Sequence, residues 1–202
     1  ILASGHMRFQ NGFLVTSPTA QVEFTDNATW AGASNTSHVK GVVQKLGNDA
    51  FTFPVGDGST LKTVTMSAPA NATDVYSAAY FKSNPALAGY DTSAYAGTLL
   101  RVSGYEYWDV KKESGTSAVV LTFSYTDPGN GQYITVPANA KIAHWTGNTW
   151  EDLGNGGSTG STSGTITTAA AVTNFGPFTF ASTNHLNCAS CISNSITFSH
   201  FW

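Results

Sequence analysis

The 202-residue sequence predicts an all-β protein, an antiparallel β-sandwich of the jelly-roll or immunoglobulin-like kind with at most one short helix. Three observations predict it. Apolar residues recur at every second position in several segments, which places them on one face of a strand. Clusters of Gly, Pro, Asn and Asp separate these segments, and helical periodicity is almost absent.

The first regular segments are short strands with one apolar face. Residues 51–55 (FTFPV) alternate in this way, and the turn sequence GDGS follows at 56–59. In residues 105–110 (YEYWDV), Trp108 and Val110 share a face with Glu106, whereas the tyrosines and Asp109 share the opposite face.

The later segments repeat this pattern. Residues 118–125 (AVVLTFSY) and 175–180 (FGPFTF) each predict a strand with one buried side. Residues 142–153 predict a hairpin with Gly147-Asn148 in the turn, because this pair favours the positive φ angles of a two-residue reversal. The compositions of 84–100 and 154–164 are less regular, and predict a short helix or long loop and a flexible loop, respectively.

These elements predict one domain. It spans residues 8–183. Residues 1–7 (ILASGHM) resemble a cloning scar. We expect residues 184–202 to be an irregular tail. Its sequence differs in character from the residues before it, which suggests a non-native origin. The tail carries Cys188 and Cys191 in a C-x-x-C. Only His185 and His200 are close in sequence as further zinc ligands, and the βαβ context of a redox pair is missing.

Composition narrows the classes of function. Charged residues make up 10% of the chain and aromatic residues 12%, which suits a folded β-protein outside the cell. The net charge of −3, without a basic cluster, excludes a nucleic-acid footprint. No apolar run approaches the roughly 18 residues of a membrane span. We expect no cofactor and no metal, and the loop at 126–132 lacks the acidic spacing of a calcium site.

Several phrases read in order resemble a known group of proteins. The phrases are VKGVVQKLGNDAFTFPVGDG, YEYWDV, AVVLTFSY, IAHWTGNTWEDLGN and GTITTAAAVTNFGPFTFAST, spread over roughly residues 39–183. Together they resemble the extracellular modules of very large secreted Bacteroidetes proteins, exported by the type IX secretion route. The resemblance implies a β-sandwich module that is secreted or lies on the outer cell surface. It carries over no catalytic residue.

The candidate ligand-binding residues are Trp145, Trp150 and Tyr107. The predicted hairpin sets Trp145 opposite Trp150, with His144 and Glu151 on the other face. An exposed indole pair can stack on the apolar C–H face of a sugar. Burial of one Trp is worth roughly 5 kcal/mol by area, however, which favours a core position for the pair. The sequence leaves both interpretations open.

Paired carboxylates are the candidate catalytic feature. A glycoside hydrolase holds two of them about 5 Å apart for retention or about 6.5–9.5 Å apart for inversion. Glu106 with Glu151 or Asp109 is the pair to consider, but nothing in their spacing shows that they converge. A structural salt bridge, with a partner such as Arg101 for Glu106, or a solvated strand edge is the favoured interpretation. Asp57 in PVGDG is expected to bond its own turn, since no phosphate-binding motif follows.

The sequence therefore predicts a non-catalytic, secreted or cell-surface β-sandwich module for adhesion or glycan binding. The partner would be a polysaccharide or a cell-surface glycan. The alternative is a glycoside hydrolase, or another polysaccharide-acting enzyme, that uses paired carboxylates. Neither the ligand's identity nor the oligomeric state follows from the sequence.

Overall fold

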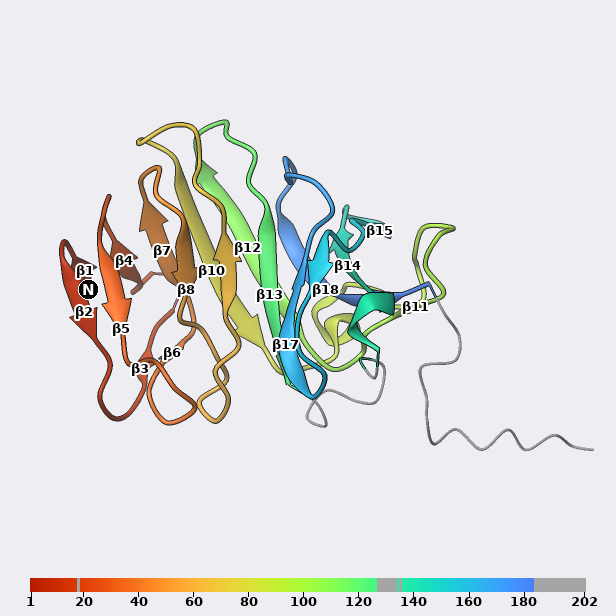
Figure 1. Ribbon diagram of the computed structural model, residues 1–202, viewed down its shortest axis with the longest axis horizontal. Helices are drawn as coiled ribbons and strands as arrows, with labels where there is room; N and C mark the ends of the chain where they lie inside the picture. Colours follow the sequence, from red (N-terminus) through yellow and green to blue (C-terminus); the bar gives the residue numbers. More distant parts are fainter. Residues whose placement is uncertain (18, 127–133, 135, 184–202) are drawn as a thin grey trace, which may run out of the picture.

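In the computed structural model, two β-sheets face each other, and the predicted all-β sandwich is confirmed (Figure 1). The structure describes residues 1–17, 19–126, 134 and 136–183. The helical elements in this part of the chain are two 3-10 turns, η1 (Pro85–Ala88) and η2 (Pro137–Asn139). None of the helices among these residues is long and apolar enough to cross a membrane.

The larger sheet has nine strands and mixes parallel and antiparallel pairing. Its order is β1 (Leu2–Ala3), β4 (Val22–Phe24), β7 (Val43–Leu46), β10 (Val75–Phe81), β12 (Tyr107–Ser114), β18 (Gly176–Ser182), β14 (Ala140–Trp145) and β15 (Trp150–Asp152), with β11 (Arg101–Val102) also paired to β18. From β7 to β15 every pairing is antiparallel, as the alternating sequence pattern predicts.

The smaller sheet has five strands and is antiparallel throughout. Its order is β16 (Gly157–Ser158), β17 (Ser163–Thr167), β13 (Leu121–Thr126), β9 (Val64–Met66) and β8 (Phe51–Phe53). Leu121, Phe123 and Tyr125 all point into the core, as their period-two spacing requires. Part of the Gly/Ser-rich segment predicted as a flexible loop is paired here, since Gly157 lies opposite Thr167.

The first 46 residues form a feature that the sequence pattern did not predict. Here the chain coils, and successive passes stack in parallel: β1 on β4 and β4 on β7, β2 (His6–Arg8) on β5 (Thr29–Ala31), and β3 (Leu14–Val15) on β6 (Val39–Lys40). We call this part, Leu2–Leu46, the N-terminal solenoid. Residues 1–7, expected to be a cloning scar, contribute β1 and part of β2 to it.

The core lies between the sheets and continues into the solenoid. Trp108, Phe123, Phe178 and Phe180 pack ring against ring at its centre, with centroids 5.2–5.6 Å apart. A smaller cluster lies on the outer face of the nine-stranded sheet, where the segment 84–100 folds over β14, β15 and β18. Its buried members are Leu99, Val102, Ala143, Trp150 and Ala181.

Candidate functional site

The predicted tryptophan hairpin is present. Trp145 on β14 lies opposite Trp150 on β15, with ring centroids 5.4 Å apart, and the Thr146 amide donates to the Thr149 carbonyl at 2.9 Å to close the turn. Gly147 in the turn has a φ of 108°, which glycine adopts without strain. On the other face His144 Nδ1 lies 2.7 Å from Glu151 Oε1, as the strand alternation predicts.

The two indoles differ in their access to solvent. Trp150 has no exposed surface, and its Nε1 donates to the Asp91 carbonyl at 3.1 Å. It therefore belongs to the small outer cluster, beneath the segment 84–100. Trp145 is half-buried and is the member of the pair that presents area to a ligand.

Tyr107, the third predicted ligand-binding residue, lies in the same aromatic assembly. It faces outward from β12, stacks on Phe81 with centroids 4.7 Å apart and an interplanar angle of 12°, and contacts the edge of Tyr90 at 5.6 Å. Tyr90 in turn lies 6.1 Å from Trp145. We call this chain of ring contacts the aromatic row; its members, in order, are Phe81, Tyr107, Tyr90, Trp145 and Trp150. Tyr107 itself is only 6% exposed.

Sequence reasoning missed Phe81 and Tyr90. Phe81 ends a strand whose alternation is weak, and its partner Tyr107 becomes visible only from the β10–β12 register. Tyr90 belongs to the irregular segment 84–100, whose path over the sheet depends on contacts with residues far along the chain, such as the Ala96 amide bonding the Trp150 carbonyl at 2.8 Å. No periodic signal marks such a position.

An open groove of about 580 Å³ adjoins the aromatic row on the outer face of the large sheet, and we call it the outer groove. Tyr90 lines it together with Asp109, Lys111, Asn174 and Pro177. Lys111 Nζ lies 3.1 Å from Asp109 Oδ2, and this hydrogen bond and charge raise the pKa of Lys111. The groove thus combines an aromatic ring with charged and amide hydrogen-bonding groups.

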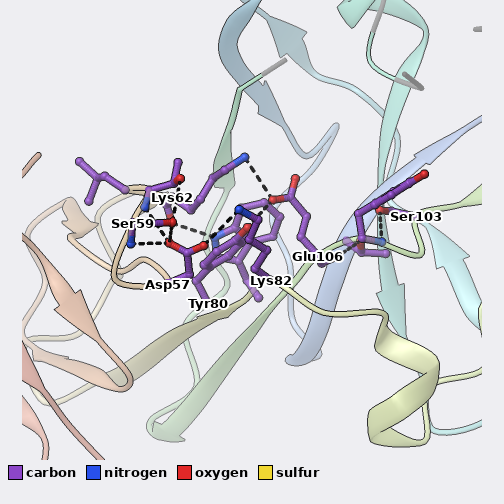
Figure 2. A network of polar contacts seen from close by, with 12 residues as sticks. Asp57, Ser59, Lys62, Tyr80, Lys82, Ser103 and Glu106 are labelled. Atoms are coloured by element: carbon purple, nitrogen blue, oxygen red, sulfur yellow. Dashed lines mark hydrogen bonds and ion pairs between the residues drawn. The ribbon is translucent and has the colours of Figure 1, made fainter. Parts of the chain in front are cut away.

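Glu106 forms a buried ion pair between the sheets. Its Oε2 accepts a hydrogen bond from the Tyr80 hydroxyl at 2.6 Å and lies 3.1 Å from Lys62 Nζ (Figure 2). The Lys62 carbonyl accepts from Trp108 Nε1 at 2.9 Å, which fixes the lysine backbone. Arg101, the partner considered from sequence, is exposed on β11 instead.

Burial shifts the pKa values of both Glu106 and Lys62. It raises the pKa of the Glu106 carboxyl, against the opposing effects of Lys62 and Tyr80. It lowers the pKa of Lys62, against the attraction of Glu106. Among the described residues, none donates a hydrogen bond to Glu106 Oε1. The pair is therefore strongly desolvated, with each charge dependent on the other.

The carboxylates considered for a catalytic pair, Glu106 with either Asp109 or Glu151, each have a different partner. Glu106 faces the core with Lys62, Asp109 faces the outer groove with Lys111, and Glu151 bonds His144. The outer groove also contains Glu113, but this residue lies four positions after Asp109 on the same strand. Glu113 accepts a hydrogen bond from the Ser77 hydroxyl, so it too has a partner other than Asp109.

Asp57 bonds its own turn, as predicted. Its Oδ1 accepts from the Ser59 amide at 2.7 Å, the Ser59 hydroxyl at 2.8 Å and the Thr60 amide at 2.6 Å. Burial acts to raise the pKa of Asp57, but these hydrogen bonds and Lys82 outweigh it, so the pKa is lowered. The turn thus holds a charged carboxylate at the surface.

The described residues contain no group of side chains that could hold a metal ion. Within residues 1–17, 19–126, 134 and 136–183, no three His, Cys, Asp or Glu side chains cluster to hold a metal ion. Cys188, Cys191 and all but the first residue of the loop at 126–132 considered for calcium lie outside this part of the chain.

Comparison with protein-family models, with curated proteins and with solved structures finds no match to this chain.

Proposed function

We propose that the protein is a non-catalytic, secreted or cell-surface β-sandwich module that binds glycans for adhesion. The ligand lies in the outer groove against Tyr90 and extends along the aromatic row to Trp145. The observation that carries the proposal is the continuity between this groove and the aromatic row. The secreted location, and an origin in Bacteroidetes proteins of the type IX route, rest on the low charge content and on the ordered phrases of the sequence.

The chemistry of the outer groove supports a saccharide. A sugar ring has an apolar C–H face that packs on an aromatic ring and an edge of hydroxyls that needs donors and acceptors. Tyr90 offers the ring, while Asp109, Lys111 and Asn174 offer an acceptor, a donor and an amide. Because Asp109 and Lys111 already form a pair, they present hydrogen-bonding groups without a large net charge.

The same geometry disfavours bond cleavage. A hydrolase needs a protonated acid on one side of the scissile bond and a second carboxylate within about 10 Å. Asp109 is paired with a lysine, and Glu113, further along the strand, accepts a hydrogen bond from the Ser77 hydroxyl. Shallow binding on a rigid sheet requires neither group to change protonation.

The test is affinity electrophoresis in gels that contain a panel of plant, algal and bacterial polysaccharides. We expect Tyr90→Ala and Trp145→Ala each to weaken retention by about 5–10-fold, since an aromatic contact is worth about 1 kcal/mol. Tyr105→Ala is the matched control, because Tyr105 is 57% exposed and lies outside both the outer groove and the aromatic row.

Far-UV circular dichroism establishes that each variant is folded before retention is compared. Retention unchanged in both groove variants, or lost equally in the Tyr105 control, would remove the outer groove as the binding site. Release of reducing ends from a retained polysaccharide would instead favour the hydrolase alternative.

A further inference from the structure

A second hollow lies where the N-terminal solenoid meets the sandwich. It has a volume of about 520 Å³, within the range of about 300–1,000 Å³ typical of small-molecule sites. Val15 and Lys40 line it from the solenoid, Asp57 from the turn after β8, and Phe81 and Lys82 from the end of β10. We call it the basic hollow.

Two lysines of the basic hollow lie against one turn. Lys82 Nζ is 3.5 Å from Asp57 Oδ2, and the exposed Lys40 side chain crosses the same turn at Gly58. A Cβ built on Gly58 would lie 3.2 Å from Lys40 Cδ and 3.7 Å from Lys40 Nζ, which shows how closely the lysine follows the turn. Both lysines thus lie along the turn that carries Asp57.

The charges that line the basic hollow do not balance. Two lysines face one aspartate, which leaves one positive charge in a chain whose net charge is −3. Asp57 Oδ1 is occupied by Ser59 and Thr60, so only Oδ2 faces Lys82. Among the described residues, none forms an ion pair with Lys40, and an ammonium carries three donors.

Phe81 and Val15 give the hollow an apolar wall, and Thr16, Gly41, Gly56 and Ser83 complete its lining. Phe81 is 40% exposed and has one ring face fixed by its stacking on Tyr107, while Val15 is 76% exposed. Tyr80 also lines the hollow, and its hydroxyl is held by the buried Glu106–Lys62 pair (Figure 2). That pair carries no net charge, so it leaves the positive balance of the lysines intact.

We propose that the basic hollow binds a uronic acid residue of an acidic polysaccharide. The carboxylate contacts Lys40 and Lys82, and the C–H face of the sugar ring packs on Phe81 and Val15. A carboxylate supplies the one negative charge that the lining lacks, while its ring uses the apolar wall. A neutral sugar leaves Lys40 without a counter-charge, since Asp57 pairs with Lys82 alone, and a simple anion leaves Phe81 and Val15 uncovered.

The experiment is isothermal titration of the protein with trigalacturonic acid, galactotriose and sodium acetate at two salt concentrations. We expect binding of trigalacturonic acid that weakens as salt rises, and affinities at least about 10-fold lower for the other two probes. The double variant Lys40→Gln/Lys82→Gln should lower the affinity for trigalacturonic acid by about 10-fold or more. Lys141→Gln is the control for loss of a basic charge elsewhere, because this lysine on β14 lies outside the hollow.

Each result bears on the proposal. Equal affinity for trigalacturonic acid and galactotriose, no binding of trigalacturonic acid, or binding unchanged in the double variant would overturn it. An equal loss in the Lys141 control would mean general attraction to basic charge and would also overturn it. Binding of acetate as tight as the oligosaccharide would reduce the hollow to a simple anion site.

The basic hollow and the outer groove can be tested apart. Tyr90→Ala alters the groove without altering any residue that lines the hollow, and the lysine variants do the reverse. The proposed glycan binding at the aromatic row therefore stands or fails independently of this second site.

Discussion

Replacing Glu106 by Gln tests the buried ion pair with little change in shape. Gln has nearly the same volume and still accepts the Tyr80 hydrogen bond, but it removes the negative charge beside Lys62. The two charged atoms are 3.1 Å apart, and the side chains of Lys62 and Glu106 are 3% and 1% exposed. Water therefore cannot replace the lost partner.

The size of the effect follows from this geometry. At 3.1 Å and an effective dielectric constant of about 20, the attraction is about 5 kcal/mol. Removing one partner of a buried pair typically costs about 3–5 kcal/mol, because an uncompensated charge stays buried. We therefore expect Glu106→Gln to lower the free energy of unfolding by about 3–5 kcal/mol near neutral pH.

The loss of unfolding free energy in Glu106→Gln should shrink as the pH rises. The folded pKa of Lys62 already lies below its ordinary value of 10.5 because of burial, and loss of Glu106 lowers it further. Between the folded pKa and 10.5 the unfolded chain binds more protons than the folded chain. Stability therefore rises with pH across this window.

The assay is urea denaturation of wild type, Glu106→Gln, Lys62→Met and the double variant. We expect the double variant to be more stable than Glu106→Gln alone, since it removes the unpaired ammonium. Glu113→Gln on the same strand is the control and should change stability by no more than about 0.5 kcal/mol. A Glu106 variant as stable as wild type, or strictly additive losses in the double variant, would refute the reasoning.

Two further predictions concern the hairpin and the turn. Trp150→Ala should lower the free energy of unfolding by about 3–5 kcal/mol, because it empties the outer cluster and orphans the Asp91 carbonyl, and denaturation should show a much smaller loss for Trp145→Ala. Asp57→Ala should cost about 1 kcal/mol near neutral pH. Since the folded pKa of Asp57 lies below 3.8, its stabilisation is present above 3.8 and is lost as pH falls through the folded pKa, so the variant and wild type should converge in acid. A difference that persists in acid would assign the effect to packing instead of charge.

Local patterns account for the parts of this fold that sequence reasoning predicted. The alternation in Leu121–Thr126 and the Gly147-Asn148 turn each act over a few residues, so the strand faces and the Trp145–Trp150 pairing could be derived directly. The pairing of Lys62 with Glu106 could not, because 44 positions separate the two residues and only the packing of the two sheets joins them.

The N-terminal solenoid escaped prediction for a different reason. Its strands contain only two to four residues, too few for alternation to be recognised, and its passes pair in parallel with partners about 21 positions away. Ala3, Phe24 and Lys45 occupy equivalent positions although their side chains differ in size and charge. Hydrogen bonds between the backbones, rather than similar side chains, join these passes.

Strand β7 belongs to both halves of the molecule. On one side it continues the stacked passes through β4, and on the other it pairs with β10, the strand that ends at Phe81. A hinge between the halves would have to break this shared ladder, so they are joined as one stiff body. The backbones that carry Lys40, on β6, and Lys82, directly after β10, are consequently fixed relative to one another, and a bound acid meets a preformed mouth that need not close around it.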